Sequence, residues 1–188
     1  MIPIYEQGSG NGIGHALDSF LNRVDGICSE HRKERRAKAF AFIFYDFKDK
    51  AIRHILKNQG VFAKLDRLTG KELSMFYLHA GTRPAIETFN INFLAALGAE
   101  NRASLPCVVF FRYENDLIRD VEIAQLESAD LIHGFKELYE AISSYIQKQP
   151  KTSIQSKAIV WLKSSTKLIG IEVFRTGLKE GLEYLLDL

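Results

Sequence analysis

The chain has 188 residues, of which 46% are hydrophobic, 11% are aromatic and 26% are charged, and its formal net charge is +2. These values exclude a disordered chain, which would have few aromatic residues and a large net charge. Two cysteines exclude a disulfide-rich scaffold, and no apolar run approaches the roughly 20 residues of a membrane span. The first residues lack the pattern of a signal peptide. We therefore expect a cytoplasmic globular protein with no membrane contact, built as one domain with an appendage.

The N-terminal segment contains a short apolar run, a glycine-rich loop and a long helix. Residues 2–5 indicate a strand, and residues 8–14 must form a loop, because four glycines cost too much backbone entropy in a regular element. From His15 the apolar residues recur at helical spacing, which predicts an amphipathic helix of about 20 residues. Its predicted buried face consists of Leu17, Phe20, Leu21, Val24, Ile27 and Cys28.

Three buried strands alternate with helices in the middle of the chain. Residues 39–45, 73–78 and 105–111 are short runs that are apolar on both faces, which is typical of central strands. Two segments with apolar residues at helical spacing lie between these strands. The first covers residues 50–68, with a possible kink or break at Gly60, and the second lies within residues 80–104.

The chain then predicts a hairpin, a closing helix and a C-terminal extension. Residues 117–123 alternate as a return strand, and Ser128 is expected to cap the last helix of the main domain. A polar linker follows at 150–156. In 157–188 most apolar positions suit a helix, whereas residues 159–162 fit either a helix or a strand.

The order of elements to residue 148 is β-α-β-α-β-α-β-β-α, which predicts an α/β fold with a mixed sheet covered by helices on both faces. In this order, and in the strand 39–45 leading straight into a long helix, the chain resembles the thioredoxin-like superfamily. The segment from Leu105 through the hairpin and the closing helix carries the resemblance further. The resemblance implies a thioredoxin-like domain over 1–148, a linker with a mainly helical extension over 149–188, and a cis-proline at Pro106.

The chain departs from that family at its reactive position. Thioredoxin-like oxidoreductases carry at least one cysteine at the start of the helix after the central strand, where the helix N-terminus lowers the thiol pKa. Residues 46–49 read Asp-Phe-Lys-Asp and contain no cysteine. Thiol–disulfide exchange is therefore not expected at this position. Cys28 and Cys107 are expected to be inert buried side chains.

A glycine-rich loop beside a helix start invites a second interpretation, because backbone N–H groups in such loops can approach an anion. The candidate ligand-binding residues are Gly10, Asn11, Gly12, Gly14 and His15. Their spacing fits neither the dinucleotide fingerprint nor the Walker motif. A turn-forming loop with no ligand is the alternative.

Two further groups of residues have a functional and a structural interpretation. The basic cluster Arg32, Lys33, Arg35 and Arg36 is either a nucleic-acid contact or the solvated end of a helix. The C-terminal extension either packs on the main domain or binds a partner. Its candidate contact residues are Trp161, Phe174 and Leu178.

No histidine pair has metal-ligand spacing and no hydrolase motif is present, so neither a metal, a cofactor nor a catalytic residue is predicted. We expect a non-redox binding or scaffold module whose extension mediates partner binding or self-association. A small-ligand or nucleotide-binding protein and a nucleic-acid-binding protein remain the alternatives.

Overall fold

The computed structural model describes residues 1–6, 14–35, 37–127, 130–147, 159–163 and 168–186. They form an α/β fold in which six helices flank a mixed sheet of eight strands. The strands are β1 (Ile2–Tyr5), β2 (His15–Ala16), β3 (Ala39–Phe44), β4 (Leu73–His79), β5 (Cys107–Glu114), β6 (Leu117–Gln125), β7 (Val160–Lys163) and β8 (Ile169–Gly170).

The sheet combines a parallel half with an antiparallel half. Its strand order is β2-β1-β4-β3-β5-β6-β7, and β8 pairs with β6 beside β7. The strands β2, β1, β4 and β3 run parallel to one another, whereas the pairs β3–β5, β5–β6 and β6–β7 are antiparallel. The predicted mixed sheet is therefore confirmed.

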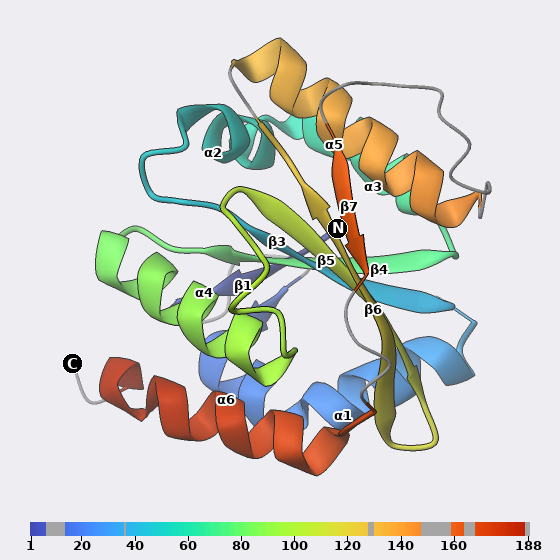
Figure 1. The fold of residues 1–188 in the computed structure, drawn as a ribbon, viewed down its shortest axis with the longest axis vertical. Helices are drawn as coiled ribbons and strands as arrows, with labels where there is room; N and C mark the ends of the chain where they lie inside the picture. The colour runs from blue at the N-terminus through green and yellow to red at the C-terminus, as the bar shows by residue number, and fades with distance from the viewer. Residues whose placement is uncertain (7–13, 36, 128–129, 148–158, 164–167, 187–188) are drawn as a thin grey trace.

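Helices cover both faces of this sheet (Figure 1), with α1, α4 and α6 on one face and α2, α3 and α5 on the other. The helices are α1 (Leu17–Lys33), α2 (Lys50–Lys57), α3 (Gln59–Thr69), α4 (Arg83–Ala96), α5 (Leu131–Ile146) and α6 (Ile171–Leu186). None of the described helices combines the length and the apolarity needed to cross a membrane.

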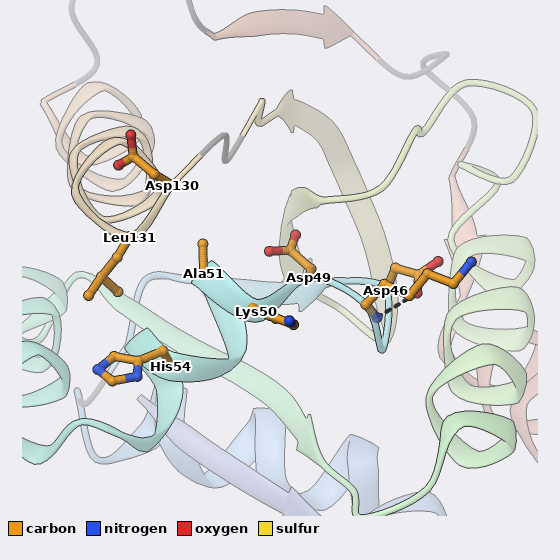
Figure 2. A pocket seen from close by; sticks show the side chains of 8 residues that line it. Asp46, Asp49, Lys50, Ala51, His54, Asp130 and Leu131 are labelled. Carbon is orange, nitrogen blue, oxygen red and sulfur yellow. Dashed lines mark hydrogen bonds between the residues drawn. The ribbon is translucent and has the colours of Figure 1, made fainter.

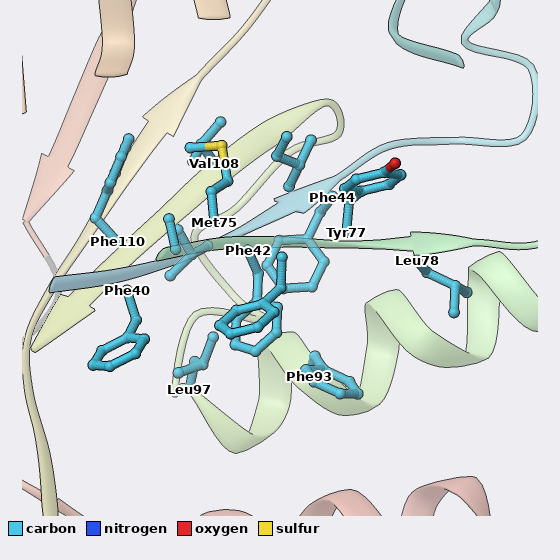
Figure 3. Close-up of a cluster of buried hydrophobic side chains, with 14 of the residues drawn as sticks. Phe40, Phe42, Phe44, Met75, Tyr77, Leu78, Phe93, Leu97, Val108 and Phe110 are labelled. Carbon is cyan, nitrogen blue, oxygen red and sulfur yellow. The ribbon is translucent and has the colours of Figure 1, made fainter. Parts of the chain in front are cut away.

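The core is built on β3, all six residues of which are buried. Figure 3 shows Phe40, Phe42 and Phe44 directed toward α4, and Phe110 on the opposite face of the sheet. The ring of Phe42 lies 5.0 Å from that of Phe93 on α4. The aromatic side chains on one face of β3 and the apolar side chains on its other face pack against the helices on the two sides of the sheet. Because both faces are buried, the run 39–45 contains no charged residue.

The predicted buried face of α1 is confirmed, but the helix does not begin at His15. Residues His15 and Ala16 form β2, which pairs with Ile4 and Tyr5 of β1. These two residues therefore extend the sheet, and α1 starts at Leu17.

Two other helix boundaries also differ from the prediction. The break in the segment 50–68 falls at Asn58, which ends α2, and Gly60 lies inside α3. The cap of α5 is Asp130, whose carboxylate accepts hydrogen bonds from the backbone N–H groups of Ile132 and His133. Ser128 lies outside the described residues.

Most described residues of the C-terminal segment are helical, in α6, but the segment also contributes strands to the sheet and is not separate from the main domain. Residues 160–163 form β7, which extends the sheet beyond β6, and α6 packs against α4 and α1. The side chains of Ile171, Phe174 and Leu178 are buried in the main core. The described part of this segment therefore completes the sheet and covers one of its faces.

Pro106 lies just before β5, and the peptide bond between Leu105 and Pro106 is cis. The next residue, Cys107, is the first of the strand, and its partner on β3 is Phe44. The proline thus lies beside the end of β3, where the chain leaves the sheet for α2.

Candidate functional site

A depression of about 640 Å³ lies where the N-termini of α2 and α5 meet. Figure 2 shows that α2 supplies one wall and the start of α5 the other, with Ala51 and Leu131 between the polar side chains. Its lining residues are Asp46, Lys48, Asp49, Lys50, Ala51, His54, Asp130 and Leu131. This is the position at which the thioredoxin-like resemblance would place reactive cysteines.

The turn between β3 and α2 is held by its own side chains. The carboxylate of Asp46 accepts a 2.8 Å hydrogen bond from the backbone N–H of Lys48, and that of Asp49 accepts one of 3.2 Å from Ile52. The guanidinium of Arg53 donates to the carbonyl of Phe47 at 2.9 Å and lies 4.1 Å from the centre of its ring. The turn therefore presents a fixed backbone to the depression.

Asp130 is engaged in the same way on the opposite wall. One carboxylate oxygen accepts 2.9 Å bonds from the N–H groups of Ile132 and His133, and the other lies 2.6 Å from Nδ1 of His133. The backbone bond from His133, followed by the bond from its ring, holds the pKa of Asp130 below its ordinary value. Asp49 and Asp130 thus serve as helix caps, and Asp46 closes the turn before α2. Among the described residues, no group of three potential ligands could hold a metal ion.

No cysteine lines the depression. Cys28 and Cys107 are both free and buried, as predicted. Burial raises the pKa of both thiols, that of Cys107 to about 12. A thiol in such surroundings remains protonated near neutral pH and is a poor nucleophile.

The rim of the depression is partly apolar. Leu131, the first residue of α5, lines the depression and is 38% exposed, and the next residue, Ile132, is 78% exposed. Large exposed apolar side chains beside a polar concavity are typical of a surface that contacts another molecule.

A second depression, of about 780 Å³, follows the edge of the sheet along β1. Gly14 and His15 line it, so the structure brings two of the candidate ligand-binding residues to a concave surface. The other three, Gly10, Asn11 and Gly12, lie outside the described residues. Sequence reasoning did not identify His31, Ser74 and Lys71, which also line this depression.

His31 and Ser74 form a polar pair in this second depression. Nδ1 of His31 lies 2.7 Å from the hydroxyl oxygen of Ser74. The rings of His15 and His31 both pack near Phe76, with centroid distances of 6.5 and 6.2 Å. Burial, and then the charge of Arg23, lowers the pKa of His15. The only sequence signal for Ser74 was a hydroxyl inside an otherwise apolar strand.

The described residues of the basic cluster have different surroundings. Arg32 donates to the carbonyl of Tyr113 and so ties the end of α1 to β5. Lys33 and Arg35 are exposed, whereas Arg36 lies outside the described residues. Part of this cluster therefore has a structural role.

Two of the three candidate partner contacts in the C-terminal segment lie in the core. Phe174 and Leu178 are each 0% exposed, because α6 turns them toward α4 and α1. Trp161 is partly buried and stacks on Phe110, with ring centroids 5.7 Å apart. These side chains stabilise the fold.

Comparison of the chain with protein-family models, with curated proteins and with solved structures returns no match to any of them.

Proposed function

We propose that this protein is a thioredoxin-like binding module without redox activity, and that the depression between α2 and α5 contacts a protein partner. The proposal is supported by the order β1, α1, β3, α2 with α3, β4, α4, β5, β6 and α5, on which the resemblance rests. The observation that carries it is the turn at residues 46–49, which lines the depression with two carboxylates that accept backbone hydrogen bonds and with no thiol.

The chemistry of the depression favours contact over catalysis. Asp49 and Asp130 are occupied by backbone N–H groups, and the remaining polar groups include the side chains of Lys50 and His54. Together with the exposed Leu131, they form a mixed surface. Such a surface suits a protein segment that adds an apolar anchor and hydrogen-bonding groups.

The redox half of the proposal is tested with an insulin reduction assay in the presence of a dithiol. We expect no turnover above the uncatalysed rate. The variants Cys28→Ser and Cys107→Ser serve as a matched pair, since both remove a buried thiol. Measurable turnover that Cys107→Ser abolishes and Cys28→Ser preserves would contradict the proposal.

The binding half is tested by site-specific photo-crosslinking in cells of the source organism. A benzoylphenylalanine is placed at Ala51 in the depression, and a control probe is placed at the exposed Glu100 after α4. We expect a discrete adduct only from position 51, and we expect Leu131→Asp to weaken it. Equal adducts from both positions, or no adduct from position 51, would count against this surface.

A further inference from the structure

The second depression has two sides, which the edge of the sheet separates. Alternate residues of β4 point to opposite faces, so Ser74 contacts His31 of α1 whereas Tyr77 meets Phe62 of α3. On the α3 side the wall is mostly apolar or aromatic, and its side chains come from β1, β4, α2 and α3. They are Pro3, Tyr5, Leu56, Phe62, Leu73 and Tyr77. We call this part of the depression the α3-side pocket.

Tyr77 brings a buried hydroxyl group to this pocket. The residue is 4% exposed, and its ring meets that of Phe62 edge to face, with centroids 6.0 Å apart. Figure 3 shows its side chain on the face of the sheet opposite α4. Its hydroxyl has no hydrogen-bond partner among the described residues. Because the oxygen is not fully sealed from solvent and the residue lines the depression, the hydroxyl faces this space.

A tyrosine hydroxyl without a partner is unusual at so buried a position, because such groups normally form a hydrogen bond. The nearby Tyr45 follows that rule and donates to the carbonyl of Leu78 at 2.6 Å. Burial, followed by the neighbouring Tyr5 and Tyr45, raises the pKa of Tyr77. Its hydroxyl therefore stays protonated near neutral pH and is an available donor in an apolar wall.

The charged groups of this depression lie at its rim. Lys57, Asp66 and Lys71 line it, and all three are exposed. A charged ligand group beside Tyr77 would lose its hydration in an apolar wall without gaining a counter-ion, which is unfavourable. A neutral acceptor such as a carbonyl oxygen costs much less to bury and would satisfy the hydroxyl.

We infer that the α3-side pocket binds a small neutral aromatic carbonyl compound, whose oxygen accepts a hydrogen bond from Tyr77 and whose ring packs against Tyr5 and Phe62. Small-molecule sites typically combine an apolar wall with a few placed polar groups. All three residues lie on one side of the sheet, so one ligand can contact them together. This site is separate from the depression between α2 and α5 and does not depend on the function proposed for it.

The ligand is tested by NMR titration of the full chain with acetophenone and ethylbenzene, which have nearly the same shape and differ in the carbonyl group. We expect acetophenone to bind about fivefold more tightly, which corresponds to one neutral hydrogen bond. It should shift the amide resonances of Phe62 and Tyr77, and leave that of His31 on the α1 side unchanged. In Tyr77→Phe the two probes should bind equally. The control Tyr139→Phe, which changes an exposed tyrosine of α5, should preserve the difference.

Urea unfolding without ligand tests the free hydroxyl. Tyr77→Phe should leave the midpoint unchanged, because it removes no hydrogen bond, whereas Tyr45→Phe should lower it, because the bond to Leu78 is lost. The inference is overturned if acetophenone does not bind at millimolar concentration, if ethylbenzene binds the wild type as tightly, or if the shifts centre on His31. It is equally overturned if Tyr77→Phe retains the preference for acetophenone, or if it lowers the midpoint as much as Tyr45→Phe.

Discussion

The side-chain amide of Asn90 donates a 2.9 Å hydrogen bond to the carbonyl oxygen of Tyr45. Asn90 is buried in the middle of α4, and Tyr45 is the residue that follows β3. The hydroxyl of Tyr45 in turn donates to the carbonyl of Leu78 at 2.6 Å. These two bonds join α4, β3 and β4 one residue before Asp46, so they fix the point where the chain enters the depression between α2 and α5.

Replacing Asn90 with alanine should therefore destabilise the protein. The variant leaves a buried carbonyl without its side-chain donor, and such a loss costs about 1–3 kcal/mol. Urea unfolding followed by circular dichroism measures the difference. The control Asn101→Ala removes an exposed amide that donates to Glu100, and its effect should stay within about 0.5 kcal/mol. Equal stability of the two variants would show that the Asn90 bond contributes nothing.

The packing of α6 predicts a larger effect for Phe174. Its ring is fully buried and meets that of Phe93 on α4 edge to face, with centroids 6.3 Å apart. The variant Phe174→Ala should lose about 3–5 kcal/mol of unfolding free energy, because the cavity that it leaves cannot close completely.

Val173, the preceding residue of α6, is the matched control, because its side chain is 70% exposed. Val173→Ala should change the unfolding free energy by less than about 0.5 kcal/mol. The fluorescence of Trp161, the single tryptophan of the chain, provides a local probe of the C-terminal segment in both variants. If Phe174→Ala retained wild-type stability, α6 would not be part of the core.

The central strands were predictable because their pattern is local. Residues 39–45 and 73–78 have apolar side chains on both faces, and only a central strand between two helical layers buries them all. The cap of α5 was not predictable in the same way, since Ser128 and Asp130 are both good cap residues two positions apart. Local preference does not distinguish between them.

The site residues depend on contacts between distant parts of the chain. His31 and Ser74 are 43 residues apart in sequence. The pairing of β4 with β3 places Ser74 beside Phe40, and the ring of His31 packs near that of Phe40. Residues 159–162 fit a helix or a strand equally well, and the free edge of β6 decides in favour of β7. A sequence pattern contains no information about such an edge, so it left the conformation of residues 159–162 open.

The thiol of Cys107 predicts a dependence of stability on pH. Burial raises its pKa to about 12, from an ordinary value of about 8.5 in an unfolded chain. Above pH 8.5 the unfolded chain therefore loses a proton that the folded protein keeps, and stability falls as the pH rises. One such group gives a slope that approaches about 1.4 kcal/mol per pH unit.

Urea unfolding between pH 8.5 and 10 measures this slope, in a range below the ordinary pKa of tyrosine, about 10. The variant Cys107→Ala should show a shallower decline than the wild type. Its control is Val109→Ala on the same strand, which removes a buried apolar group and should lower stability equally at every pH. A decline of unchanged slope in Cys107→Ala would mean that the thiol ionises in the folded protein as it does in the unfolded chain.

Two glycines on either side of the start of α1 should respond in opposite directions to alanine. A Cβ atom on Gly14 would lie 2.5 Å from Cε2 of Tyr5 and 2.9 Å from the carbonyl oxygen of Pro3, whereas a Cβ atom on Gly26 would meet nothing within 4 Å. Gly14→Ala should therefore cost about 1–3 kcal/mol of stability, because the backbone of β1 must shift to make room. Gly26→Ala, inside α1, should raise stability by about 0.5–1 kcal/mol, because alanine loses less backbone entropy in a helix. Urea unfolding of both variants tests the close approach of residue 14 to β1: if the two shifts had the same sign, β2 would not pack against β1 as described, and the wall of the second depression at Gly14 and His15 would be lost with it.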